Sequence, residues 1–141
     1  MYSTNNPKPE LNSTIPVAKN KCYELLYMPA KNRVYLSIYG FWKSKSIVSE
    51  YLPDLQKVLH LVKPGFTLLV DTRTMITHPQ PVMKLHIEAQ MLLQDAGMAK
   101  GACVDPTDRI ATLQVEDTLG ASHLSLTRFN SFAEAESWLE Q

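Results

Sequence analysis

Five short stretches of the chain carry the hydrophobic patterns of β-strands. Val34, Leu36 and Ile38 alternate with residues of other kinds, as in a strand that buries one face. Phe66 to Val70 is a continuous apolar run, which is typical of a central strand covered on both faces. The predicted strands are Cys22 to Met28, Arg33 to Tyr39, Phe66 to Val70, Gly101 to Val104, and Leu124 to Phe129.

Four helices are predicted between and after these strands, because apolar residues recur there every three or four positions. Pro53 falls inside the first helix, so we expect a kink there or two shorter helices. Asp105 followed by Pro106 predicts the start of the third helix, and Ser131 with Glu134 forms a capping-box pattern before the last. The predicted helices run from Ile47 to Val62, from Val82 to Ala96 with Gly97 as C-cap, from Pro106 to Gly120, and from Phe132 to Leu139.

The order of these elements predicts an α/β fold. Strands that alternate with helices favour right-handed crossovers and a mostly parallel sheet, to which the opening hairpin adds an antiparallel edge. We therefore expect a mixed, mostly parallel five-stranded sheet with about four helices, in one domain over residues 21–141. Residues 1–20, rich in Asn and Pro, are predicted to be a flexible tail. The expected core residues are Leu36, Ile38, Leu69, Val70, Val104, Leu126 and Trp138.

Charge and composition narrow the classes of partner. Lys plus Arg number 14 and Asp plus Glu number 14, so the net charge is zero and the basic excess of a nucleic-acid binder is missing. No apolar stretch reaches the roughly 18 residues of a membrane span or forms the core of a signal peptide. Cys22 and Cys103 lie in apolar runs, where we expect reduced thiols. These features predict a cytoplasmic protein that binds no nucleic acid.

Histidine and cysteine, which serve in catalysis and metal binding, are present, but they do not stand at the spacings of known catalytic or metal-binding motifs. No two of the four histidines stand at the spacing that pairs metal ligands on one helical face. No G-x-S-x-G turn and no glycine-rich phosphate loop occurs. Cys103 with His78 is the one conceivable nucleophile and base, and a buried structural thiol is the commoner situation. We predict no metal, no cofactor and no enzymatic activity.

Polar residues follow the most apolar strand directly. Asp71, Thr72, Arg73 and Thr74 stand where that strand ends, which is the edge at which open α/β sheets bind ligands. The same residues are also those that stabilise turns, with Asp71 bonding to nearby amides. The sequence leaves both interpretations open.

Several segments resemble the STAS, or SpoIIAA-like, family of anti-sigma-factor antagonists. The hairpin that ends in Tyr39-Gly40 is similar to the strand before the first helix of that family. Phe66 to Asp71 resembles its central strand, and Phe129 to Ala135 followed by Trp138-Leu139 resembles its closing strand and helix. The resemblance covers residues 22–141 and implies a small non-enzymatic regulatory or interaction module that docks a protein partner.

In members that act as switches, a hydroxyl at the start of the second helix is phosphorylated, and the resemblance assigns that role to Thr77. We therefore expect a binding surface around Asp71 to Pro81. Its candidate residues are Asp71, Thr72, Arg73, Thr74, Thr77 and His78.

Two further expectations concern what the domain binds. Self-association as a homodimer is the first, since a zero net charge removes one barrier to it. The alternative function is a module that binds a small apolar ligand or a lipid in a pocket near the 72–81 loop. Met83, Met91 and Met98 are candidates to line such a pocket, because thioethers adapt to irregular shapes.

Overall fold

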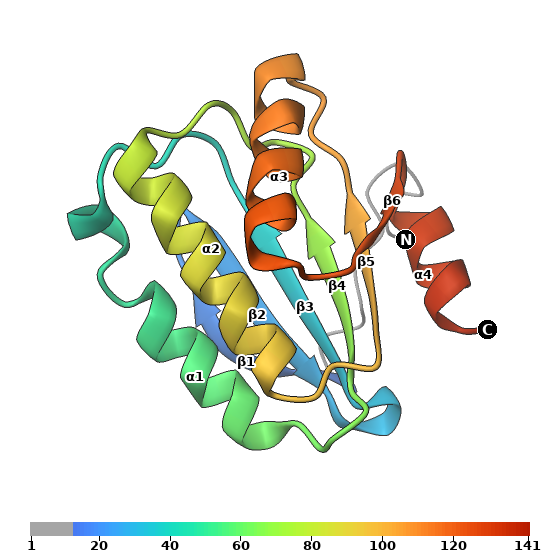
Figure 1. Ribbon diagram of the computed structural model, residues 1–141. Helices are drawn as coiled ribbons and strands as arrows, with labels where there is room; N and C mark the ends of the chain where they lie inside the picture. The colour runs from blue at the N-terminus through green and yellow to red at the C-terminus, as the bar shows by residue number, and fades with distance from the viewer. Residues whose placement is uncertain (1–12) are drawn as a thin grey trace, which may run out of the picture.

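The computed structural model describes residues 13–141, which form a six-stranded mixed sheet with helices on both faces (Figure 1). The strands lie side by side in the order in which they occur along the chain. The first two pairings are antiparallel and the remaining three are parallel. The strands are β1 (Ile15–Lys19), β2 (Tyr23–Met28), β3 (Arg33–Ile38), β4 (Thr67–Asp71), β5 (Lys100–Val104) and β6 (Thr127–Phe129).

The predicted α/β class is confirmed, and the predicted count of five strands is wrong. The additional strand is β1, which lies within the predicted tail and pairs with β2. Pro16 and a bulge between Pro16 and Ala18 concealed the strand pattern, and both are features of edge strands. The rest of the predicted tail, residues 1–12, lies outside the described residues.

Three helices cover one face of the sheet, as Figure 1 shows. Each connects two neighbouring parallel strands, and all these crossovers step across the sheet in the same direction. Since such crossovers are right-handed, the three helices have to lie on the same side. The helices are α1 (Tyr51–Leu61), α2 (Gln80–Asp95) and α3 (Arg109–Ser122), with short 3₁₀ turns η2 (Pro29–Lys31) and η3 (Lys45–Val48).

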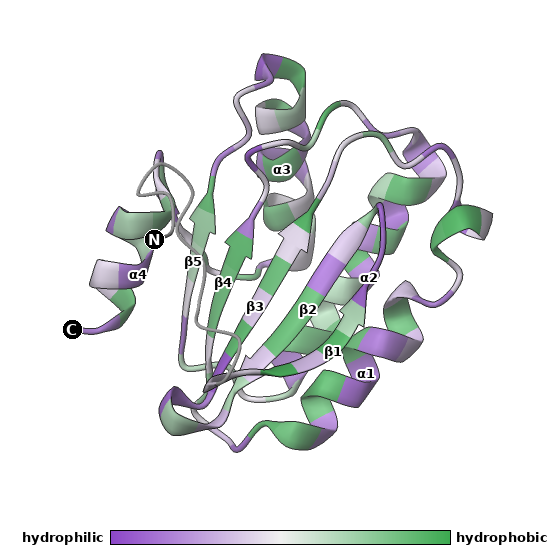
Figure 2. Ribbon diagram, turned by 180° about the vertical axis from the view of Figure 1, so that it is seen from behind, coloured by the Kyte–Doolittle hydropathy of each residue, from purple (hydrophilic) through white to green (hydrophobic). Residues whose placement is uncertain are grey.

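The last helix, α4 (Phe132–Leu139), packs on the opposite face, over β4, β5 and β6. Seen from that side in Figure 2, β4 and β5 are hydrophobic along most of their length, as expected for strands covered on both faces. Of the predicted core residues, Leu126 and Trp138 are half-buried. The others are buried: Leu36, Ile38, Leu69, Val70 and Val104.

Some helix boundaries differ from the sequence prediction. Pro53 lies in the first turn of α1, where a missing backbone donor costs little, and η3 precedes the helix as a separate turn. Asp108, and not Asp105, caps α3 by accepting from the amide of Ala111. That helix continues past Gly120 to Ser122.

Two predicted helix ends are confirmed in detail. Ser131 accepts a hydrogen bond from the Glu134 amide at 3.1 Å, and its hydroxyl donates to the Glu134 carboxylate at 3.1 Å. Gly97 follows α2 with a φ of 90°, a left-handed conformation that glycine adopts at low cost.

A buried arginine at the start of β3 joins α4 to the sheet. Arg33 on β3 is 3% exposed, and its Nε donates to the Thr67 hydroxyl at 2.9 Å. Its Nη1 lies 3.0 Å from a Glu136 carboxylate oxygen and 2.8 Å from one of Glu140. Its Nη2 donates to the carbonyl of Leu139 at 3.2 Å. One guanidinium therefore binds an adjacent strand and the last turn of the C-terminal helix.

The Arg33→Lys variant is expected to unfold more easily by about 1–2 kcal/mol in urea melts. Lysine keeps the charge but cannot reach the hydroxyl, the carbonyl and both carboxylates together. Lys31→Arg is the matched control, because Lys31 bonds to the same Glu140 from a side chain that is 39% exposed, whereas that of Arg33 is buried. Its expected effect is below about 0.5 kcal/mol. Equal effects in the two variants would show that the forked geometry contributes nothing.

Candidate functional site

The loop between β4 and α2 is attached to the neighbouring strand at its first residue. Thr72 is buried, and its hydroxyl donates to the carbonyl of Val104 at 2.6 Å. Its backbone amide donates to the same carbonyl at 3.0 Å. Thr72, a predicted binding residue, therefore faces the interior and anchors the loop to β5.

A second attachment joins the loop to the segment that follows β3. The amide of Gly40 donates to the carbonyl of Thr74 at 3.1 Å, and the amide of Ile76 donates to the carbonyl of Gly40 at 3.1 Å. Between these bonds the side chain of Met75 is buried. The two segments thus run side by side beyond the carboxyl ends of their strands.

His78 makes the third attachment through both nitrogens of its buried ring. Nε2 lies 2.9 Å from the carbonyl oxygen of Gly40, which can only accept, so this nitrogen carries the proton. In a neutral ring Nδ1 is then an acceptor, and it lies 2.9 Å from Nε2 of His86. His86 must therefore donate from Nε2, which leaves its own Nδ1 without a proton.

Other side chains enclose this histidine pair. The indole of Trp42 stacks on His78, with ring centroids 5.1 Å apart, and lies 4.8 Å from His86. Gln114 on α3 accepts from the backbone amide of His78 at 2.8 Å and donates to its carbonyl at 2.9 Å. His78 therefore joins the loop to α2, to α3 and to the segment after β3.

Burial sets the protonation states of this cluster. It lowers the pKa of His78, and it lowers the pKa of His86 to about 3. Burial also raises the pKa of the Cys103 thiol to about 12, and the nearest polar contact of its sulfur is the Thr72 hydroxyl at 3.9 Å. Burial therefore favours a neutral histidine pair and a protonated thiol, which is the less nucleophilic form of cysteine.

Asp71 and Arg73 form an ion pair with two side-chain hydrogen bonds at the end of β4. Asp71 accepts from the backbone amide of Arg73 at 3.1 Å, from its Nε at 2.9 Å and from its Nη2 at 2.7 Å. These hydrogen bonds raise the pKa of Arg73. The guanidinium also lies over the ring of Phe132, 5.9 Å from its centroid. The bonding of Asp71 to a nearby amide matches the turn interpretation of this segment.

The remaining residues of the loop point outward. Thr74, Ile76 and Thr77 are exposed, and so is Phe41 on the adjoining segment. We call these four residues the loop surface. Of the predicted binding residues, Thr74 and Thr77 belong to it, Asp71 and Arg73 are half-buried beside it, and Thr72 and His78 support it from within.

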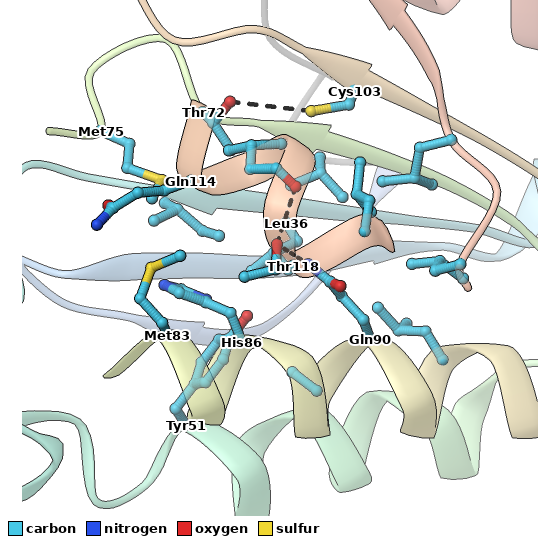
Figure 3. Close-up of a pocket in the computed structure, with 18 residues that line it drawn as sticks. Leu36, Tyr51, Thr72, Met75, Met83, His86, Gln90, Cys103, Gln114 and Thr118 are labelled. Atoms are coloured by element: carbon cyan, nitrogen blue, oxygen red, sulfur yellow. Dashed lines mark hydrogen bonds between the residues drawn. The ribbon is translucent and has the colours of Figure 1, made fainter. Parts of the chain in front are cut away.

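An internal cavity lies behind the loop, between the sheet and helices α2 and α3 (Figure 3). Met83 lines it, as do Tyr51, His86 and Gln114. Met91, which the sequence suggested for such a pocket, is exposed on the outer side of α2. Met98 lines a separate groove near the C-terminal end of α2. Tyr51 and His86 were not predicted as site residues, although each interrupts the buried apolar face of a helix with a polar atom.

Within residues 13–141, no three His, Cys, Asp or Glu side chains gather in a way that could hold a metal ion. No helix in the same range is long and apolar enough to cross a bilayer. Comparisons with known protein families, curated proteins and solved structures find no match to this chain. Its function is therefore argued from the geometry.

Proposed function

We propose that the chain is a non-enzymatic regulatory or protein-interaction module of the STAS type, which binds a protein partner through the loop surface. The supporting observation is the way the β4–α2 loop is held. Thr72, Met75 and His78 fix it to three neighbouring segments from inside, and Thr74, Ile76 and Thr77 between them are exposed. A loop fixed in this way presents its outer side chains in one arrangement.

The composition of the loop surface suits a protein partner. Phe41 is 52% exposed and Ile76 is 44% exposed, and the backbone bond between Gly40 and Ile76 keeps their segments together. Burying large apolar side chains against a partner is favourable, and a rigid surface loses little conformational entropy on binding. Large side chains that become fully desolvated at the centre of an interface are those that contribute most to the binding energy.

The hydroxyl of Thr77 adds a means of control to this proposal. Thr77 is exposed beside Ile76, so a kinase can reach it. A phosphate there would place about two negative charges next to the apolar side chains of the loop surface. In the proposed module this charge weakens the binding of a partner that contacts Phe41 and Ile76 through apolar side chains.

The test compares Ile76→Asp with wild type in capture of the partner from extracts of the source cells. We expect the retained amount of partner to fall at least about tenfold, as for a residue at the centre of an interface. Thr77→Glu, which imitates part of the phosphate charge, is expected to act in the same direction. Sedimentation of the purified proteins decides whether the partner is a second copy of the chain.

Leu61→Asp is the matched control. Leu61 is 42% exposed at the end of α1, just before the chain enters the N-terminal end of β4, whereas the loop surface follows the C-terminal end of that strand. Its capture is expected to stay within about twofold of wild type. Both variants must first show wild-type circular dichroism. Retention that survives Ile76→Asp and Thr77→Glu would show that the β4–α2 loop is a connector.

A further inference from the structure

The cavity behind the β4–α2 loop contains no charged side chain among its lining residues. The cavity has a volume of about 40 Å³, counted as the positions that the centre of a water molecule can occupy. At roughly 10–15 Å³ for each water, this is room for about three waters or for a molecule of a few heavy atoms. Its walls are mostly apolar, with a few polar groups on helices α1, α2 and α3, which is the usual composition of a small-ligand site.

Most of the polar groups on the wall already bond to one another. Gln90 donates to the Thr118 hydroxyl at 2.9 Å, and that hydroxyl donates to the carbonyl of Val115 at 3.0 Å. The Gln90 carbonyl accepts from Ser122 at 2.6 Å. Gln114 is engaged with the backbone of His78. These groups shape the cavity and have little left to offer a ligand.

His86 and Tyr51 differ from them. The tautomer imposed by His78 leaves Nδ1 of His86 as an acceptor, and within residues 13–141 this atom has no hydrogen-bond partner. The Tyr51 hydroxyl likewise has none in the described part of the chain. His86 is 5% exposed and Tyr51 is 1% exposed. Figure 3 shows both side chains directed into the cavity from α2 and α1.

Two unpartnered polar atoms in a buried apolar space specify a kind of ligand. Both atoms are open to the cavity and not sealed by protein, since among residues 13–141 only Nη2 of Arg128 is a fully buried side-chain nitrogen or oxygen without a partner. A molecule in the cavity that bonds to both is therefore favoured. A charged ligand is disfavoured, because no opposite charge lines the cavity. One hydroxyl group can donate to the histidine and accept from the tyrosine.

We propose that this cavity binds a small uncharged alcohol, whose hydroxyl donates to Nδ1 of His86 and accepts from the hydroxyl of Tyr51. The apolar body of the alcohol lies toward Met83 and Met75, which belong to the loop side of the cavity. Their flexible thioethers adjust to its shape. This site is separate from the loop surface and does not depend on it.

The test uses 2-propanol and acetone as matched probes, observed through the ¹³C-labelled methyl groups of the methionines. Both molecules have four heavy atoms, but acetone cannot donate a hydrogen bond to His86. We expect saturable shifts of the Met75 and Met83 signals, with acetone binding about threefold to tenfold more weakly. Met91, which is 50% exposed on the outer side of α2, is the internal control for solvent effects.

Tyr51→Phe removes one oxygen and leaves the packing of the ring in place. We expect it to weaken 2-propanol binding by about threefold to tenfold. Equal affinity for the two probes in wild type, or unchanged 2-propanol binding in Tyr51→Phe, overturns the assignment of the hydroxyl. Absence of saturable shifts at Met75 and Met83, or a crystal soaked in 2-propanol that shows ordered water only, overturns the site itself.

Discussion

Replacing Leu69 with alanine is expected to lower the free energy of unfolding by about 2–5 kcal/mol. Leu69 is 1% exposed at the centre of β4, between Tyr35 of β3 and Ala102 of β5. It belongs to the buried cluster on the face that α4 covers, which includes Phe132. β4 is hydrogen-bonded to β3 on one side and to β5 on the other, so its backbone cannot move to fill the cavity that the mutation leaves.

Urea denaturation of wild type and Leu69→Ala at neutral pH measures this effect. Leu113→Ala removes the same atoms from a side chain that is 55% exposed on α3, and we expect less than about 0.5 kcal/mol there. A loss below about 1 kcal/mol for Leu69→Ala would contradict a central position of β4 in the core.

Acidification is expected to destabilise the fold through the buried histidine pair. The pKa of His86 falls from 6.5 in the unfolded chain to about 3 in the fold, because burial disfavours the charged ring. The same cause lowers the pKa of His78. Between pH 6.5 and 3 the unfolded state therefore binds protons that the folded state does not. The resulting stability is fully present above pH 6.5, falls as the pH is lowered, and stops changing near pH 3.

The difference in the pKa of His86 corresponds to a loss of at most about 5 kcal/mol. Urea melts at pH 7, 5 and 4 follow this loss, and protonation of carboxylates adds to it in every variant. His86→Gln isolates the contribution of His86, because a glutamine amide can donate to Nδ1 of His78 and does not titrate. The variant is expected to lose less stability between pH 7 and 4 than wild type does. Parallel pH dependences in the two proteins would contradict a neutral, buried His86.

Hydrophobic periodicity predicted the five strands and four helices between residues 22 and 141 in the right order. The 3₁₀ turns η2 and η3 were not predicted, and the strand predicted from Leu124 to Phe129 is limited to Thr127–Phe129. The periodicity failed where local signals competed. Pro16 and the Asn- and Pro-rich sequence before it resemble a tail, yet pairing with β2 makes Ile15–Lys19 a strand. Asp105 and Asp108 are both good helix caps, but Asp108 caps α3 and Asp105 instead binds Arg128 on the neighbouring strand β6.

For the candidate site, the sequence predicted where its residues lie in the fold but not which side chains face inward. The end of β4 follows from the apolar run before it, so Asp71 to Thr74 could be placed at the sheet edge. Which side chains turn inward depends on partners distant in the chain, such as Gly40 for His78. For the same reason the sequence suggested a pocket near the loop with Met83 on its wall but not its polar lining, since Tyr51 and His86 meet there from different helices.

The consecutive strand order also has a consequence for synthesis. Each strand pairs with the one made just before it, so the sheet can grow at one edge as the chain leaves the ribosome. Arg33 depends on a later segment, since its carboxylate partners lie 103 and 107 residues further along the chain. Until α4 is made, that guanidinium has no counter-charge from Glu136 or Glu140, and cannot be buried without cost. Formation of α4 is thus the step that allows Arg33 of the β2–β3 hairpin to be buried with its counter-charges.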